Sequence, residues 1–199
     1  MRLFASSFLA AALMSSGALA QAVPAPETAG PKAEAPDNPA RSSLEDLFDR
    51  LGKATDETEA QGIARLIERR WGRSGSDTAD LLMSRATEAM HRKDYPLAVE
   101  LLDRVLVLQP GWAEAWYRRA NVFYMLDDPV SAIADIREAV HLEPRHFGAW
   151  TGLGHILMSS DDKTRALEAY RRALTIYPQL STVQDLVKRL APEVDGLDL

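Results

Sequence analysis

The 199-residue chain contains no cysteine. This absence excludes structural disulfides, zinc sites built from thiolates and cysteine nucleophiles. Long apolar runs are also missing after the first twenty residues. Because a membrane-spanning helix needs about 20 predominantly apolar residues, no later segment predicts one. Any stable core must therefore come from packed side chains, without disulfide cross-links.

Basic residues are not in excess. The chain has 23 lysines and arginines against 29 aspartates and glutamates, which gives a formal net charge of −6 at pH 7. Proteins that bind nucleic acid usually carry a basic excess that neutralises phosphates. The composition therefore argues against a nucleic-acid partner, while the 46% of hydrophobic residues is ordinary for a globular protein.

Patterns that would carry catalysis or hold a cofactor are absent too. The four histidines are dispersed along the chain, and no two of them have the helical spacing of a zinc site. No serine lies in a nucleophile-elbow motif, and Gly152 and Gly154 fall inside a predicted helix rather than in a phosphate loop. The sequence therefore predicts no catalytic residue, no metal site and no cofactor, which indicates a protein that is not an enzyme.

The first twenty residues are typical of a secretory signal peptide. A short basic start precedes an apolar stretch from Leu3 to Met14, and Ala18 and Ala20 supply the small residues of a cleavage site. We expect cleavage before Gln21. The mature chain would then be an exported protein without a membrane span, and we expect it in the periplasm of a Gram-negative bacterium.

Residues 21–41 predict a linker. Five prolines lie between Ala22 and Ala40, where they break any helix, and the segment has few residues to bury. We expect a partly extended, disordered tether. It is either a functional spacer or simply a frayed terminus.

The sequence does contain a repeat with a step of 34 residues. Apolar residues spaced three and four apart predict helices within each unit, and a proline ends each unit. A helical repeat of this period is typical of binding scaffolds, in which neighbouring units bury each other's apolar faces. Three columns show the step: Ala98, Ala132 and Ala166; Pro110, Pro144 and Pro178; and Leu82, Trp116 and Trp150.

Each unit is predicted to be a pair of antiparallel helices. Small residues on the first helix (Ala86, Ala120 and Gly154) would meet the alanine column of the second, which lets the two helices cross closely. The expected pairs cover 78–92 with 95–108, 112–126 with 129–142, and 147–159 with 163–176.

This pattern resembles the tetratricopeptide repeat (TPR) family. The resemblance implies an all-α solenoid, a right-handed superhelix of antiparallel helix pairs, with units at 79–112, 113–146 and 147–180. Arg85 and Arg119 depart from the family, which usually has leucine there, and we expect their stems to pack while their charged ends reach water. The unit 113–146 fills the signature columns best, with Trp116, Ala120, Phe123, Ala132, Ile136, Ala139 and Pro144.

Further helices are expected on both sides of the three units. Residues 42–78 predict a helix pair that begins with a capping box formed by Ser42 and Glu45. Some repeat columns persist there, so we interpret the pair as a degenerate N-terminal unit. Residues 181–199 predict a capping helix, opened by a second capping box at residues 181–184, and an acidic tail.

In the TPR family the first helix of each unit lines a concave groove, so the resemblance implies a peptide site there. Aromatic, thioether and polar side chains of this mixture suit an extended or helical peptide. They do not suit the clamp with which some members grip a C-terminal carboxylate, because Gly148 and Gly152 stand where it needs other side chains. Alternatively, they are ordinary exposed helix residues. The candidates are Met83, Thr87, Tyr117, Arg118, Asn121, Tyr124, Thr151, His155 and Met158.

Together these features predict a non-enzymatic scaffold, exported to the periplasm, that binds a peptide or helix of another protein in its concave groove. By analogy with small exported TPR proteins, its process would be the assembly or integrity of the cell envelope. Two alternatives stay open at this point. One is a structural subunit of an envelope complex that is held by its convex face, and the other is an enzyme whose site lies in the groove.

Overall fold

The computed structural model describes residues 43–196, which form nine α-helices and no β-strand. The expected signal peptide (1–20) and linker (21–41) lie outside the described residues. None of the described helices combines the length and the apolar character needed to cross a membrane. The helices are α1 (Leu44–Lys53), α2 (Glu57–Trp71), α3 (Asp77–His91), α4 (Tyr95–Leu108), α5 (Ala113–Met125), α6 (Pro129–Leu142), α7 (Phe147–Ser159), α8 (Lys163–Ile176) and α9 (Ser181–Val194).

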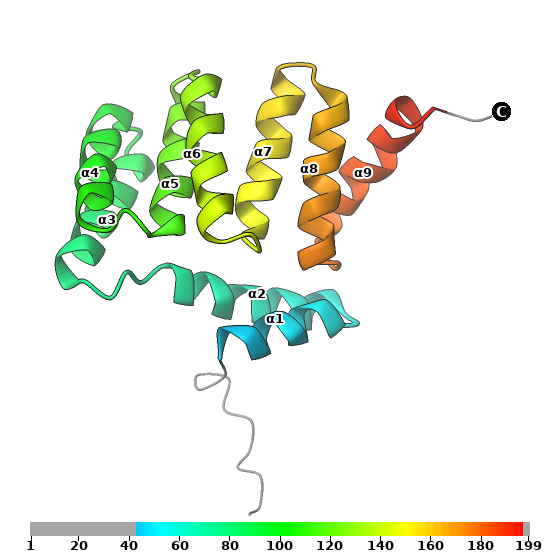
Figure 1. Ribbon diagram of the computed structural model, residues 1–199, viewed down its shortest axis with the longest axis horizontal. Helices are drawn as coiled ribbons and strands as arrows, with labels where there is room; N and C mark the ends of the chain where they lie inside the picture. Colours follow the sequence, from blue (N-terminus) through cyan, green and yellow to red (C-terminus); the bar gives the residue numbers. More distant parts are fainter. Residues whose placement is uncertain (1–42, 197–199) are drawn as a thin grey trace, which may run out of the picture. The chain divides into compact units, whose positions relative to one another are not determined.

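Helices α3 to α8 form three antiparallel pairs that stand side by side (Figure 1). Successive pairs meet through α4 with α5 and through α6 with α7, and α9 then packs on α8. The expected all-α stack of helix pairs is confirmed. Helices α4, α6, α7 and α8 have the bounds that the sequence predicts, and the ends of α3 and α5 differ from expectation by one residue.

The turn between the two helices of a pair is the same in all three units. It places one residue at positive φ (Lys93 at 61°, Asp127 at 59° and Asp161 at 57°). An aspartate follows as the N-cap of the second helix and accepts a hydrogen bond from a backbone N–H three residues later. These N-caps, which form one more 34-residue column, are Asp94, Asp128 and Asp162.

The third unit packs its helices differently from the other two. Tyr170 stands where the earlier units have Leu102 and Ile136, and it is fully buried. A β-carbon on Gly154 would lie 2.3 Å from Cε1 of Tyr170, well inside contact distance. Glycine is therefore required at position 154, because the ring of Tyr170 occupies the space that its side chain would need. The second unit has alanine at the equivalent position, Ala120.

The repeat pattern predicts that the two repeat tryptophans pack in the core, and Trp116 does pack against two core clusters. Both tryptophans also link consecutive units. Trp116 and Trp150 are only partly buried. Each indole Nε1–H donates to the carbonyl oxygen of the proline that closes the preceding unit, over 2.8 Å to Pro110 and 2.9 Å to Pro144. The aromatic column therefore ties consecutive units together through a repeated hydrogen bond.

Arg119 lies in an ion-pair network, where a water-exposed end was expected. Its guanidinium donates to Asp135 over 2.7 and 2.8 Å and to Asp103 over 2.7 Å, and it lies 4.9 Å from the centroid of the Trp116 ring. Asp135 is buried, so the network joins α4, α5 and α6. Arg85 is exposed, as expected.

Both predicted capping boxes differ from the structure. Ser43 is the N-cap of α1 and forms a capping box with Asp46, whereas the predicted N-cap, Ser42, lies outside the described residues. Helix α9 has no side-chain cap, and the hydroxyl of Ser181 instead donates to Glu57 over 2.8 Å. Helix α9 also runs through Pro192, where the tail was expected to begin.

Helices α1 and α2 form the expected helix pair but do not continue the stack. The pair lies across one end of α5 to α8, and α1 packs on α8 (Figure 1). Among the described helices, no interface of similar extent joins α2 to α3. The apolar face of the pair is buried against Phe147 and Tyr177. Although residues 42–78 keep some repeat columns, α1 and α2 therefore do not stack as a further unit before α3.

Candidate functional site

A cavity of ≈ 390 Å³ lies between the first helices of the second and third units, α5 and α7. Tyr117 and Tyr124 line it from α5, and His155 lines it from α7. Glu68 of α2 and Leu180, just before α9, complete the wall. The helix pair that leaves the stack therefore supplies part of this groove.

Most of the groove residues expected in the second and third units meet at this cavity. Arg118 lines a neighbouring cavity instead. The other three are not brought there: Met83 is buried between α3 and α4, Thr87 donates to the Met83 carbonyl oxygen, and Met158 packs toward α8 and α9. The five residues that line the cavity as expected are Tyr117, Asn121, Tyr124, Thr151 and His155.

The neighbouring cavity, of ≈ 280 Å³, is built around a buried pair formed by Glu114 and His146. Nε2 of His146 lies 3.1 Å from Oε2 of Glu114, and the backbone N–H of Ala149 donates to Nδ1 over 3.1 Å. Since Nδ1 accepts, the ring proton lies on Nε2 and is donated to Glu114. Nε of Arg118 donates to Oε1 of Glu114 over 2.6 Å.

These contacts keep Glu114 ionised. Burial alone would raise the pKa of its carboxyl group, but the hydrogen bond from His146 and the charge of Arg118 outweigh burial and hold the pKa below its ordinary value. The charges of Glu114 and Arg118 therefore compensate each other. Burial also raises the pKa of Tyr117, whose ring packs 4.7 Å from that of His146, so its hydroxyl stays protonated.

Glu68 brings a negative charge that has no partner. Within residues 43–196 its carboxylate accepts no hydrogen bond and forms no ion pair. Loss of hydrating water, followed by repulsion from Glu114, raises the pKa of Glu68, and attraction to the charges of Arg118 and Arg65 does not cancel the effect. Sequence reasoning missed Glu68 because it placed α2 at the end of the stack, away from the groove.

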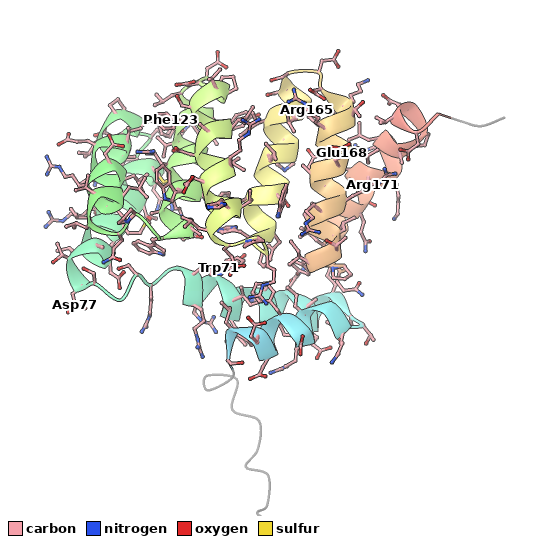
Figure 2. The ribbon with its side chains drawn as sticks, viewed as in Figure 1. Trp71, Asp77, Phe123, Arg165, Glu168 and Arg171 are labelled. Atoms are coloured by element: carbon pink, nitrogen blue, oxygen red, sulfur yellow. The ribbon has the colours of Figure 1, made fainter. Side chains whose placement is uncertain are left out.

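Trp71 holds α2 against the stack (Figure 2). Its indole stacks on His146 with ring centroids 4.3 Å apart and lies 5.2 Å from the ring of Phe147. Its carbonyl oxygen accepts from Nε1 of Trp112 over 2.6 Å. Its own Nε1–H is buried without an acceptor among the described residues. An unpaired buried donor costs about 1–3 kcal/mol, so the indole N–H opposes this placement of Trp71. The packing of the indole ring against its aromatic neighbours therefore holds α2 in place.

Polar contacts fix the rest of the pair. Arg145 donates two hydrogen bonds to Glu45, over 2.7 and 2.8 Å, and its guanidinium lies 4.1 Å from the centroid of the Phe48 ring. The side-chain amide of Gln179 donates to the carbonyl oxygen of Ala54 over 3.0 Å. The place of Glu68 in the groove therefore follows from contacts along both helices of the pair.

His155 contributes no charge to the cavity at pH 7. Its Nδ1 lies 2.9 Å from the hydroxyl oxygen of Tyr170. Burial lowers the pKa of His155 and raises the pKa of Tyr170 to about 12. The tyrosine hydroxyl is therefore protonated and the imidazole neutral, and Glu68 is the one carboxylate or cation among the described residues that line the cavity.

The cavity offers groups for recognising another chain. Its polar groups include the amide of Asn121 and the hydroxyl of Thr151, beside the carboxylate of Glu68. Within the part of the chain that the structure describes, no group of three or more histidine, aspartate or glutamate side chains could hold a metal ion. The arrangement can hydrogen-bond to a peptide and pack against its side chains.

Comparisons with known proteins agree with this architecture. A family model described as tetratricopeptide repeat matches residues 83–144 and 117–181. A Rhizobium etli protein, named a TPR repeat-containing protein, is 36% identical over 202 residues, which cover 98% of this chain and 97% of that protein. The chain belongs to the tetratricopeptide repeat family. The alignment with the Rhizobium TPR protein includes α1 and α2, so the similarity extends beyond the three repeats.

Other TPR proteins match a smaller part of the chain. The small glutamine-rich tetratricopeptide repeat-containing protein 2 of Mycosarcoma maydis is 32% identical over 100 residues, which cover 50% of this chain and 28% of that protein. The first TPR of Spaghetti (RPAP3), bound to the HSP90 peptide SRMEEVD, superposes with a TM-score of 0.57 at 17% identity, over 61% of this chain and 96% of that one. At that identity the likeness shows the TPR fold alone.

Proposed function

We propose that this TPR protein is a non-enzymatic scaffold that binds a segment of a partner protein between α5 and α7. The observation that carries the proposal is the convergence of Tyr117, Asn121, Tyr124, Thr151 and His155 on one cavity. Its volume of ≈ 390 Å³ is at the lower end of the range for ligand pockets. It therefore suits one or two side chains of a partner better than a large molecule.

The cavity side chains have the properties of peptide-binding residues. Tyr124 is 37% exposed, so part of its ring is available to a partner. Tyrosine supplies a large contact area at a low cost in conformational entropy. The side-chain amide of Asn121 can both donate to and accept from a peptide backbone.

We also propose that the protein acts in the periplasm, in the assembly or integrity of the cell envelope. The support for export is the charged start, apolar stretch and small-residue cleavage site of the first twenty residues. Mass spectrometry of the protein from fractionated cells tests it. The periplasmic protein should begin at Gln21, and an intact Met1 in the cytosolic fraction would contradict export.

A structural role through the opposite face is the competing proposal. Two valines favour it, because Val107 on α4 is 83% exposed and Val130 on α6 is 78% exposed. Exposed apolar residues of this kind are found at protein interfaces, although single ones are also common on ordinary surfaces. A test of function must therefore compare the groove with this second face.

Site-specific photocrosslinking in cells compares the two faces. A photoreactive phenylalanine analogue replaces Tyr124 in one strain and Val130 in another. We expect a crosslinked partner from position 124 and none from position 130. The double substitution of Asn121 and Tyr124 by alanine should weaken capture of that partner at least about tenfold, since two contact residues are lost.

The control for that loss is Val130→Ala, which should leave capture unchanged. Tyr117 is left intact because it packs on His146, and its removal would disturb the fold. Crosslinking from position 130 alone would refute groove binding and support the structural role.

A further inference from the structure

Among the residues that the structure describes, the groove lining carries one formal charge, and that charge is negative. Glu68 supplies it from α2, without a hydrogen bond or ion pair within residues 43–196. In the adjoining cavity, the charge of Arg118 is matched by its 2.6 Å contact with Glu114. A ligand that enters the groove therefore meets a net negative potential.

The charged and apolar ends of the groove are separate. Glu68 also lines the second cavity together with Glu114 and His146, which lie at the beginnings of α5 and α7. Tyr124 and Met125 line the groove from the last turn of α5. Tyr117 lines both cavities together with Glu68 and lies seven positions before Tyr124, which corresponds to a separation of about 10 Å along the helix.

We propose that the groove selects a partner segment in which a lysine or arginine lies close to an apolar side chain. The cation contacts Glu68, and the apolar side chain fills the cavity beside Tyr124 and Met125. This inference rests on the proposed function and adds the chemistry of the partner. Charge complementarity supports it, because a cation supplies the partner that the Glu68 carboxylate lacks.

The same geometry disfavours acidic partners. A peptide whose charged side chains are all acidic would bring carboxylates toward Glu68, with no cation among the described residues of the cavity lining to receive them. Like charges at short range repel, and the effect is largest where water is partly excluded. Burial, and then one such repulsion from Glu114, already raises the pKa of Glu68.

Titration of the purified protein with three tripeptides, followed by NMR, tests the proposal. The probes are Lys-Ala-Leu, Gln-Ala-Leu and Glu-Ala-Leu, each acetylated and amidated so that the first side chain carries the only difference in charge. Side chains two positions apart share one face and are about 7 Å apart, and the long lysine side chain covers the remaining distance.

We expect the lysine peptide to bind about twofold to fivefold more tightly than the glutamine peptide, the range for an ion pair in contact with water. The glutamate peptide should bind most weakly, and the backbone signals of Tyr124 and Thr151 should shift. In Glu68→Gln, the lysine and glutamine peptides should bind equally well. Glu59→Gln is the matched control, because this exposed glutamate of α2 does not line the cavity.

Each contrary result has a distinct meaning. Equal binding of all three peptides at the groove overturns the proposed selectivity and leaves groove binding intact. Tightest binding of the glutamate peptide overturns it as well. If no peptide shifts the groove signals, the inference also fails, and crosslinking from position 124 then decides separately whether the groove binds a protein. Shifts of these signals on dilution without peptide would mean that a second copy fills the groove, which also overturns the proposal.

Discussion

Replacing Gly154 with alanine should destabilise the third unit, because Tyr170 already occupies the space of the new methyl group. The added carbon would lie 2.3, 2.5 and 2.7 Å from three atoms of the tyrosine ring. The ring is fully buried, and its hydroxyl contacts His155, so it cannot move aside without losing packing and a hydrogen bond. In the second unit, alanine at position 120 is tolerated because Ile136 is smaller.

The size of the effect follows from two opposing contributions. Overpacking a core typically costs about 1–3 kcal/mol. Removing a glycine from a helix interior returns up to about 1 kcal/mol. Gly154→Ala should therefore lower the free energy of unfolding by roughly 1–2 kcal/mol. For a protein of this size, the melting temperature should fall by about 2–8 °C.

A double-mutant cycle tests the mechanism rather than the size alone. Tyr170→Ile should cost about 2–4 kcal/mol, because it leaves a cavity. Combined with Gly154→Ala, it recreates the Ala120 and Ile136 pairing of the second unit. The double variant should therefore be at least about 1 kcal/mol more stable than the sum of the single changes predicts. Urea unfolding, followed by circular dichroism, measures all four proteins.

Gly62→Ala is the matched control, because a β-carbon there would meet nothing within 4 Å. It should stabilise the protein by up to about 1 kcal/mol through helix propensity alone. If Gly154→Ala is as stable as the original chain, or if the cycle is additive, the tyrosine ring is not the reason for the glycine.

Two further predictions concern the network beside the groove. Trp71→Phe keeps an aromatic ring packed on His146 and removes an unpaired donor, so the free energy of unfolding should change by less than about 1 kcal/mol. Trp71→Ala should cost about 3 kcal/mol, expose the backbone amides of α1 and α2 to hydrogen exchange and abolish the preference for the lysine peptide. Unchanged amide exchange in Trp71→Ala would refute the docking role. Because the pKa of Glu114 is lowered in the folded protein, its stabilisation is present above the ordinary pKa that it has in the unfolded chain and is lost as pH falls through the folded pKa. Glu114→Gln should thus cost about 1–3 kcal/mol at pH 7 and flatten the acid side of the stability profile, and an unchanged profile would show that the pair does not stabilise the fold.

The repeats could be predicted from the sequence because their determinants are local and occur three times. Small residues, prolines and tryptophans recur at one step, and four helices have the predicted bounds. The aspartate N-caps follow the same step, so a complete comparison of columns would have found all of them. The burial of Met83 was missed because the family's groove positions were applied equally to every unit. In this chain the first unit uses that position for its core.

The placement of α1 and α2 could not be predicted in this way. Their helical pattern is local, but their docking depends on contacts across about half of the chain, such as that of Glu45 with Arg145. One signal was available. Trp71, Phe147 and Tyr177 are aromatic residues outside the signature columns, and all three lie in the cluster that buries this pair. Aromatic residues that a repeat pattern does not explain are therefore the best sequence evidence for packing outside the stack.

The docked pair also explains how an unfavourable charge persists in the groove. Ionised Glu68 opposes folding slightly, since its raised pKa means that the folded chain holds the proton more tightly than the unfolded chain does. The ring contacts of Trp71 and the paired hydrogen bonds between Arg145 and Glu45 act in the opposite direction and hold the docked helices in place. A cation from a partner would reverse the sign of the Glu68 contribution. Binding at the groove should thus strengthen the docking of α2, because the carboxylate then stabilises the position in which the aromatic contacts hold it.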